Sequence, residues 1–471
     1  MINYKAGAPI AAGGFGCVFK PPLLCNDQDL NYSNTGISKL MYTEHAEQEM
    51  KEINKVKLII KQHIKNYQNY FIMDDINICK PAALKETDKR DFDKKCRNFD
   101  SNINKKNINN NLNKLAIINI PDGGEEINDY FKNFVDEQVS LSKIPTLFQR
   151  MFLTQIENNF KEFIMTNNSL IELLINGIIP LNKQNFLHLD IKGENILKKN
   201  ESGKIYTRLI DWGLSGSFKP GEIPNFVKNK VLQYNLPFGI ILFSTNYKLF
   251  IKNNWNKLGS KQIAYRIYNN SRRRSDQHDK YIREFIIEAL YKWGLSQQLT
   301  SLNFLKVDNF LPEDLIVDNL AIIIHKFTDN EGNFDDIGYF DTVFTKNADI
   351  YGFLSCYIQI VLETEIISNN KDLPNNLLIS KIWMILVEYC FSTKYATKPI
   401  PINIIKKKLR NLNSLLLKSS PISHRFGTRT RKSGETKKSK CVSYKLSSGK
   451  KRCSNSYRRS SKNSKICNRC K

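Results

Sequence analysis

The sequence of 471 residues contains no uninterrupted apolar run of about 18 residues, the length that a membrane-spanning helix needs. Its first ten residues, MINYKAGAPI, also lack the basic-then-apolar order of a secretory signal peptide. We therefore expect an intracellular protein without a membrane span. Hydrophobic residues make up 41% of the chain, as in ordinary globular proteins, and the length suits two domains or one large domain with insertions.

Most of the chain lacks closely spaced pairs of cysteines, such as C-x-x-C, that would indicate a metal site. Six of the ten are scattered, and because thiols stay reduced inside cells we expect these six to be free. They are Cys17, Cys25, Cys79, Cys96, Cys356 and Cys390. The remaining four offer one C-x-x-C pair and two long gaps, which makes a zinc site the less favoured interpretation. These four are Cys441, Cys453, Cys467 and Cys470.

Acidic residues are almost absent from the C-terminal end of the chain. Residues 419–471 hold 17 lysines and arginines against one acid, Glu435, so this tail carries most of the net charge of +25. Because it also lacks apolar periodicity, we predict a disordered basic tail. Its charge predicts salt-sensitive binding to nucleic acid or another polyanion.

The body of the chain changes from strand patterns to helix patterns along its length. Apolar runs predict short strands at 37–41 and 115–120. Residues 86–114 are polar and Asn-rich, which indicates an insertion or a disordered loop. Helical patterns fill 130–180 and most of 220–418, so the fold class is α+β. Between the first two strands, apolar spacings of three and four predict an amphipathic helix with the stripe Met50, Ile53, Val56, Ile60 and Ile64.

The stretch FLHLDIKGENIL places a carboxylate, an ammonium and a carboxamide between two apolar ends. Asp190 could orient or deprotonate an attacking hydroxyl, and Lys192 could neutralise a phosphoryl group. Further on, Asp211 follows an apolar strand, and its carboxylate together with the oxygen of Asn195 suits a hard cation such as Mg²⁺. This combination indicates phosphoryl transfer, which depends on positioning and charge neutralisation. A solvated turn is the alternative interpretation of this stretch.

A second stretch, AAGGFGCVF, offers backbone N–H groups that can approach phosphates closely. Lys39 lies in the first predicted strand and could reach the same phosphates. A lysine in an apolar strand needs a partner, which we expect to be Glu49, with Glu52 as the second choice. Taken alone, the glycines could form a plain hairpin and Glu49 could be an exposed helix charge. The residues expected to hold the nucleotide are Ile10, Gly13, Gly14, Gly16, Val18, Lys39 and Glu49.

In this order the motifs resemble those of the eukaryotic-type serine/threonine protein kinases. AAGGFGCV is similar to the glycine-rich loop, HLDIKGEN to H-R-D-x-K-x-x-N, and DWG to D-F-G. Lys39 and Glu49 match the third-strand lysine and the glutamate of the following helix. DIYGFL, from Asp349, resembles the helix motif that anchors the catalytic loop. The resemblance spans residues 6–418.

Several positions depart from the family pattern. Ala11 replaces the first glycine, and Trp212 replaces phenylalanine. Leu189 replaces the usual arginine, so we expect activity without phosphorylation of the activation loop. No A-P-E occurs, and residues 235–243, NLPFGIILF, are expected to fill its role. A large insertion is expected near 245–345. With the Asn-, Lys- and Ile-rich composition and the basic tail, these features resemble kinases of giant nucleocytoplasmic DNA viruses.

The resemblance implies a two-lobed protein kinase fold, with an N-lobe at 1–122, a helical C-lobe at 123–418 and the tail at 419–471. It implies that ATP binds under the glycine-rich loop, with its adenine against residues 120–123. Asp190 and Lys192 would be catalytic, and Asn195 and Asp211 would bind Mg²⁺. The acceptors would be serine or threonine hydroxyls of protein substrates, in the host cytoplasm or the virion if the protein is viral.

Three other functions stay open at this point. An ATP-binding pseudokinase would keep the fold without turnover, although the catalytic carboxylates are present. A small-molecule kinase of the aminoglycoside or choline type also carries H-x-D-x-x-x-x-N, but Lys192 and the Asp349 motif argue against it. A nucleic-acid-binding virion protein would act through the basic tail. The oligomeric state and the preferred substrate sequence do not follow from the sequence.

Overall fold

The computed structural model describes residues 7–13, 16–27, 36–97, 99, 103–142, 152–296, 311–365, 376–419, 444–445 and 451–452. The chain divides into two compact units, Met1–Ser423 and His424–Lys471. In the second unit the described residues form one antiparallel pair, β11 (Tyr444–Lys445) with β12 (Lys451–Arg452). The rest of the tail, with its four cysteines, lies outside the described residues. Its predicted disorder and the zinc alternative therefore stay predictions.

The first unit begins with an antiparallel sheet in the order β1-β2-β3-β5-β4. The predicted strands at 37–41 and 115–120 are confirmed as the neighbouring strands β3 and β5 of this sheet. β5 buries the apolar side chains of 115–118 in succession, and β3 buries Leu40 and Met41. In this register Lys39 lies opposite Val18 on one side and Ile118 on the other. The strands are β1 (Ala8–Gly13), β2 (Gly16–Lys20), β3 (Ile37–Tyr42), β4 (Asn77–Cys79) and β5 (Leu115–Ile120).

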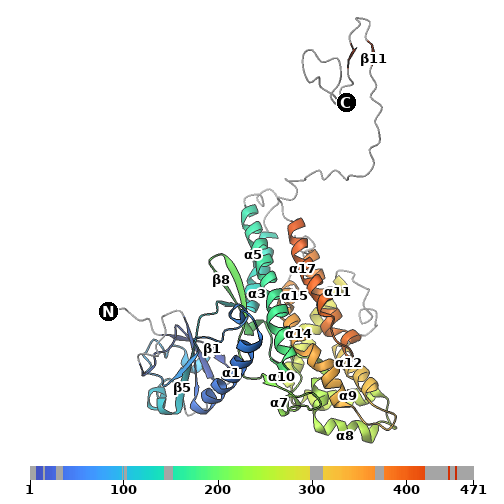
Figure 1. Ribbon diagram of the computed structural model, residues 1–471, viewed down its shortest axis with the longest axis horizontal. Coiled ribbons are helices and arrows are strands. Elements are labelled where there is room, and N and C mark those ends of the chain that lie inside the picture. The colour runs from blue at the N-terminus through green and yellow to red at the C-terminus, as the bar shows by residue number, and fades with distance from the viewer. Residues whose placement is uncertain are drawn as a thin grey trace. The chain divides into compact units, whose positions relative to one another are not determined.

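Helix α1 (Thr43–His63) follows β3 directly and packs on the sheet (Figure 1). The predicted apolar stripe is confirmed, because Ile53, Val56 and Ile60 are buried and Met50 packs against the core. Spacings of three and four place these side chains on one face of the helix. The helix therefore carries Glu49, one residue before Met50, along the edge of its buried face.

The Asn-rich segment 86–114 is not a disordered loop where the structure describes it. It contains α2 (Phe92–Lys95), η3 (Ile108–Asn110) and η4 (Leu112–Lys114). Four of its apolar side chains join a small core with residues of β2, β3 and β5. These four are Phe92, Phe99, Ile103 and Ile108, and they are too sparse among the polar residues to give a periodic signal.

The prediction that the scattered cysteines are free is wrong for four of them. Disulfides join Cys17 to Cys96 and Cys25 to Cys79. The partners are 79 and 54 residues apart in sequence, and only folding brings their Cα atoms to 5.0 and 5.8 Å. Spacing alone could not reveal such pairs. Cys356 and Cys390 are free thiols, as predicted, and both are buried.

After β5 the first unit becomes largely helical, so the predicted α+β class is confirmed (Figure 1). A three-stranded sheet, β6-β8-β9, lies beside α3 and α5, and β7 of the pair β7–β10 contacts α6. The elements between β5 and residue 245 are β6 (Glu125–Glu126), α3 (Ile127–Ser142), α5 (Leu153–Glu172), η6 (Leu173–Ile178), α6 (Ile179–Lys183), β7 (Phe186–Leu187), η7 (Gly193–Asn195), β8 (Ile196–Glu201), β9 (Lys204–Leu209), β10 (Gly216–Ser217), α7 (Asn225–Lys228) and η8 (Phe238–Phe243). The lobe boundary at 122 and 123 stays a prediction.

The segment predicted as an insertion, near 245–345, folds into helices that pack into the same core as the remaining C-terminal helices. Its elements are α8 (Thr245–Asn254), α9 (Ser260–Arg272), α10 (Asp276–Lys280), η9 (Tyr281–Ile287), α11 (Glu288–Ser296), α12 (Pro312–Phe327), α13 (Asp336–Tyr339) and η11 (Phe340–Phe344). The helices that follow are α14 (Thr345–Ser355), α15 (Ile358–Glu365), α16 (Asn376–Leu386), η12 (Val387–Phe391), η13 (Thr393–Tyr395) and α17 (Ile402–Ser419).

One helix among the described residues, Leu153–Lys183, is long and apolar enough to cross a membrane. Half of its most apolar window is buried inside the protein, where the helix packs against β9 and α17. Core helices of soluble proteins pass the same test, so this helix is a weak sign of a membrane span. The expectation of no span stays a prediction.

Candidate active site

One buried carboxylate, that of Asp349, anchors the loop between β7 and β8. Asp349 on α14 accepts hydrogen bonds of 2.9 Å from the backbone N–H groups of His188 and Leu189. Asn182 donates a third, of 2.6 Å, to the same side chain. These three donors compensate for the burial of a charge that is 1% exposed. They also hold Leu189 in a left-handed conformation, with φ 56°.

Asp190 follows in this loop, and side chains from two segments fix its carboxylate. Oδ2 accepts a hydrogen bond of 2.9 Å from Asn195 Nδ2 and forms an ion pair with Lys192 Nζ at 3.2 Å. Oδ1 accepts a hydrogen bond of 3.0 Å from Asn235 Nδ2. Asn235 is a site residue that sequence reasoning missed: it lies 45 residues downstream, and its segment, 235–243, was expected only to take the place of A-P-E.

The orientation of the Asn195 amide follows from its partners. Its Nδ2 donates to the carboxylate of Asp190 and also to the Asp190 carbonyl at 2.8 Å, and both of these atoms only accept. The oxygen of the amide is therefore free for another ligand. The backbone links Asn195 to the next segment, since Ile210 N–H donates to the Asn195 carbonyl at 2.9 Å.

Asp211 lies at the end of β9 and faces the same cleft as Asn195. It has a left-handed φ of 64° and is exposed, so its carboxylate is accessible. Two hard oxygen ligands suit Mg²⁺, which usually takes one or two protein ligands and completes its shell with water and substrate phosphates. Among the described residues no group of three or more His, Cys, Asp or Glu side chains forms a closed metal site. The donors present therefore fit a metal that arrives with a phosphate ligand.

Trp212 borders the cleft, but its side chain is packed in the core and is 2% exposed. Its ring contacts Phe71, Phe186 and His188, with centroid distances of 5.5, 6.2 and 4.8 Å. Burial lowers the pKa of His188, which is therefore neutral. Its Nδ1 accepts from Asp190 N–H at 3.3 Å, so Nε2 carries the proton and donates to the Ile210 carbonyl at 3.1 Å. This packing ties the loop of Asp190 to the segment of Asp211.

On the sheet side of the cleft, Lys39 and Glu49 form a close ion pair. Lys39 Nζ lies 2.8 and 2.7 Å from the two carboxylate oxygens of Glu49, and both side chains are mostly buried. Burial raises the pKa of Glu49, the charge of Lys39 opposes that rise, and the nearby Asp211 adds to it. Glu52, the second choice, instead contacts Lys55 and Gln48. The pair is local, because a strand residue meets the first turns of the next helix.

These groups line one cleft with a volume of about 430 Å³. This size is within the range of small-molecule sites. Its apolar side chains can sandwich a planar base, and its polar side chains can contact the phosphates. The apolar residues include Ile10, Val18, Ile37, Ile120 and Leu197, and the polar ones include Lys39, Glu49, Lys192, Asn195 and Asp211.

Glycines of the β1–β2 hairpin and of residues 120–123 serve two different purposes. Gly13 and Gly16 pair across the end of the β1–β2 hairpin, and a side chain at Gly16 would collide with the Leu40 carbonyl. Gly14 lies outside the described residues, so its expected contact with phosphate stays a prediction. In residues 120–123, which are expected to contact the adenine, a side chain at Gly123 would meet Leu197 and Ile72 at 2.4 and 2.5 Å. This glycine lets the chain pass close to the expected position of the base.

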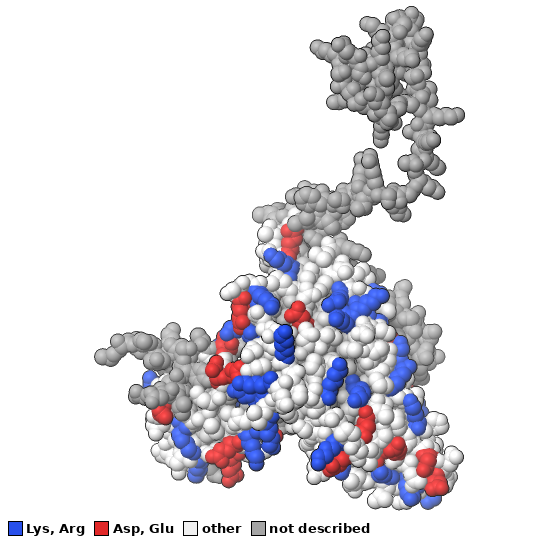
Figure 2. Space-filling model, viewed as in Figure 1, with Lys and Arg blue, Asp and Glu red and all other residues white. Residues whose placement is uncertain are grey.

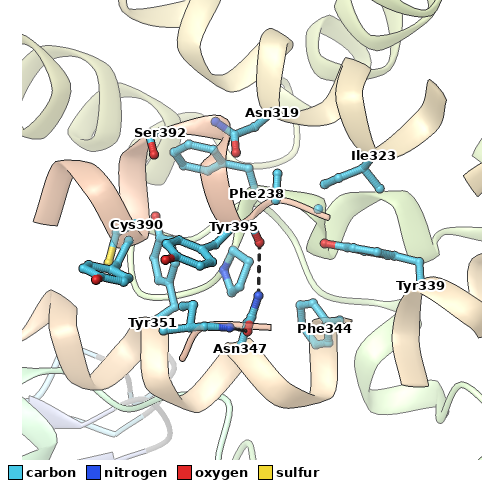
Figure 3. A pocket seen from close by; sticks show the side chains of 15 residues that line it. Phe238, Asn319, Ile323, Tyr339, Phe344, Asn347, Tyr351, Cys390, Ser392 and Tyr395 are labelled. Atoms are coloured by element: carbon cyan, nitrogen blue, oxygen red, sulfur yellow. Dashed lines mark hydrogen bonds between the residues drawn. The ribbon is translucent and has the colours of Figure 1, made fainter. Parts of the chain in front are cut away.

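Of residues 235–243, expected to take the place of A-P-E, 238–243 form η8 and are buried in the core. Behind Phe238 lies a cavity of about 30 Å³, large enough for a water but not for a ligand (Figure 3). Asn347 lines this cavity and donates to the carbonyls of Tyr395 and Lys398 at 3.1 and 3.0 Å. It lies two residues before Asp349, so the start of α14 fixes the loop before α17 as well as the loop of Asp190.

Comparison with known proteins shows a partial similarity to protein kinases. Myosin light chain kinase 2, skeletal/cardiac muscle, of Rattus norvegicus is 30% identical over 121 residues, which cover 24% of this chain and 16% of the rat protein. Myosin light chain kinase family member 4 of Homo sapiens is 28% identical over 128 residues, or 26% of each chain. No family model matches the sequence. The chain thus spans between about a sixth and a quarter of these relatives, and the similarity suggests a protein kinase domain.

Proposed function

We propose that this chain is a protein kinase that transfers the γ-phosphoryl group of ATP to serine or threonine hydroxyls of protein substrates. One observation carries the proposal: Lys192, Asn195, Asp211 and the Lys39–Glu49 pair, from separate segments, line a single cleft. Asp190 contacts two of them. The partial similarity to myosin light chain kinases supports the same activity.

In this mechanism the chain's own residues position and stabilise the reactants. Lys39, held by Glu49, would neutralise phosphate oxygens, and the Asn195 oxygen and Asp211 would hold Mg²⁺. The metal supplies neutralisation of the charge that develops on the phosphates. Asp190 accepts the proton of the acceptor hydroxyl, and Lys192 beside it stabilises the transferred group. Asn235 fixes the direction of the Asp190 carboxylate.

The restriction to serine and threonine rests on Lys192 in the Asp190 loop and remains part of the proposal. A viral origin is also part of the proposal, and the departures from the family pattern and the basic tail support it.

The experiment is incubation of the full chain with radiolabelled ATP, Mg²⁺ and a basic protein such as histone, followed by acid hydrolysis and separation of phosphoamino acids. Phosphoserine or phosphothreonine is expected. Labelling only of an aminoglycoside or choline in parallel reactions would favour a small-molecule kinase, and no labelling of any acceptor would favour a pseudokinase.

A further inference from the structure

A second cavity, of about 330 Å³, lies outside the cleft, between helices α8 and α9. It is open to solvent and is lined by two arginines, three asparagines, two aromatic rings and Ile267, with no acidic side chain. No motif in the sequence marks it. Its chemistry therefore has to be derived from the side chains themselves.

The two arginines, Arg266 and Arg273, have no carboxylate partner among the described residues. Other arginines in the same region are paired: Arg272 and Arg283 both approach Asp279, at 3.9 and 2.9 Å. Arg266 and Arg273 are exposed, so their guanidinium groups are available to a ligand. The cavity therefore favours an anion.

The spacing of the arginines limits the kind of anion. Seven residues apart, they lie on one face of α9 about 10 Å from each other along the axis. Arginine side chains are long enough to converge on one group between them, and their planar forks match phosphate oxygens. A phosphoserine or phosphothreonine carries about −1.5 to −2 charges at neutral pH, which balances two guanidinium groups, whereas a carboxylate carries one.

The remaining lining fits a peptide better than a free ion. Asn269 and Asn270 lie between the arginines on α9, and their amides can donate to and accept from a peptide backbone. Tyr247 and Phe250 on α8 provide an apolar wall for a neighbouring side chain.

The cavity is connected to the active site through the corner between α9 and α10. Ser275 in that corner accepts a hydrogen bond of 3.2 Å from Leu232 N–H, three residues before Asn235. Burial lowers the pKa of His278 on α10, and the charges of Lys192 and Asp190 also act on this side chain. The corner is thus close to Lys192 and Asp190.

We propose that the cavity between α8 and α9 is a docking site for a phosphoserine or phosphothreonine of a protein substrate. A bound phosphoresidue holds the substrate so that a second hydroxyl of the same chain reaches Asp190. The inference rests on the proposed kinase function for the source of the second phosphate. Binding at the cavity itself needs no turnover.

The test is fluorescence anisotropy of a labelled peptide with one phosphoserine, titrated with the full chain in the absence of ATP. The matched peptides carry serine or glutamate at the same position. The protein variants are Arg266→Gln with Arg273→Gln, and as a control Arg410→Gln, an exposed arginine on α17. We expect the double variant to lose at least about tenfold in affinity for the phosphopeptide, the control to bind like wild type, and the serine and glutamate peptides to bind more weakly.

The docking site would be overturned by equal affinity for the phosphorylated and unphosphorylated peptides, or by wild-type affinity of the double variant for the phosphopeptide. It would also be overturned if the double variant lost affinity for an oligonucleotide as much as for the phosphopeptide, because the arginines would then bind phosphates of any kind. A phosphotransfer assay with the same peptides separates this inference from the proposed function. In the wild type, the phosphopeptide should have a lower KM than the serine peptide. In the double variant this difference in KM should be lost, while kcat on the serine peptide stays unchanged. This result supports both the docking site and the kinase function. Binding without any phosphotransfer would retain the docking site and reject the kinase function.

Discussion

Asp190 is held on both carboxylate oxygens, and its partner on Oδ1, Asn235, begins the segment expected to take the place of A-P-E. Asn235 Nδ2 donates to this oxygen at 3.0 Å and also lies 3.3 Å from the Ile191 carbonyl. Asn235 is 2% exposed, so no water can replace its amide without rearrangement. It is a positioning residue, which acts on the acceptor hydroxyl only through Asp190.

Replacement of this amide tests its role directly. We expect Asn235→Ala to lower kcat by roughly 10- to 100-fold, because small displacements of catalytic groups have effects of this order, while the KM for ATP changes little. Steady-state kinetics at saturating protein substrate measures both constants. Asn229→Ala, at an exposed position in the same segment, is the matched control and should behave like wild type. An unchanged kcat for Asn235→Ala would remove the residue from the mechanism.

Lys230 is a second residue near Asp190 that no motif indicated. Its Nζ is buried and has no hydrogen-bond partner among the described residues. Burial lowers its pKa to about 8, although Asp190 attracts the charge. The folded pKa is thus below the unfolded value of 10.5, so the charged form is disfavoured by folding.

The sign of this shift gives a prediction for stability. The cost is fully present below about pH 8, decreases as pH rises, and is gone above about pH 10.5, with a magnitude of about 3 kcal/mol. We expect Lys230→Met to increase the free energy of unfolding at pH 7 and to have little effect at pH 10.5. Urea unfolding at the two pH values measures this difference. A loss of stability in Lys230→Met at pH 7 would show that the ammonium has a stabilising partner.

At the scale of elements, one disulfide attaches segment 86–114 to the sheet, and the other links two parts of the chain that precede this segment. Cys17 lies on β2 beside Val18, which lines the cleft, and its partner Cys96 follows α2. Cys25 and Cys79 join the loop after β2 to β4. The small core of this region contains all four cysteines together with the apolar side chains of the segment.

Loss of these cross-links should destabilise the protein. By loop-closure entropy, a link that closes 79 residues contributes about 4 kcal/mol, and one that closes 54 residues contributes about the same. We expect a reducing agent to lower the unfolding midpoint in urea, and to lower it less in a Cys17→Ser, Cys96→Ser double variant. Identical unfolding curves with and without reductant would show that the thiols are not paired in the folded protein.

The elements that sequence could predict are those with local signals. The strands around Lys39 and Ile118 and the stripe of α1 follow from periodicity, and the Lys39–Glu49 contact follows because the strand and the helix are adjacent in the chain. Asn235, Lys230 and the disulfides could not be predicted, because packing alone brings those distant residues together. The disorder alternative for 86–114 was wrong for the same reason.

At the scale of the whole molecule, charge is the dominant feature. Figure 2 shows lysines and arginines spread over the visible face of the described residues, with fewer acidic side chains among them. The tail from residue 419 onward adds 17 basic side chains against Glu435. Binding of a polyanion such as DNA or RNA through this tail is a proposal that the charge alone supports.

Removal of the tail should separate this binding from the proposed chemistry. We expect deletion of 420–471 to abolish most nucleic-acid affinity and to leave the rate on a short peptide nearly unchanged. Because each neutralised phosphate of duplex DNA adds about 0.9 to the slope of log affinity against log salt, the full chain should show the steeper slope. Affinity measured across a salt series for both proteins tests this. Equal slopes and affinities would exclude the tail, and a Zn²⁺ requirement would favour the metal-site alternative.

The central claim is that Asp190 and its neighbours catalyse phosphoryl transfer, and single-turnover transfer from radiolabelled Mg·ATP by Asp190→Asn tests it most directly. The account predicts a rate about 10²- to 10⁴-fold below wild type with ATP affinity retained, since the variant lacks only the group that accepts the proton. Glu49→Gln and Glu52→Gln form a matched pair on α1, and only Glu49→Gln should reduce the rate, because only Glu49 contacts Lys39. Full activity of Asp190→Asn on a protein substrate would contradict the account.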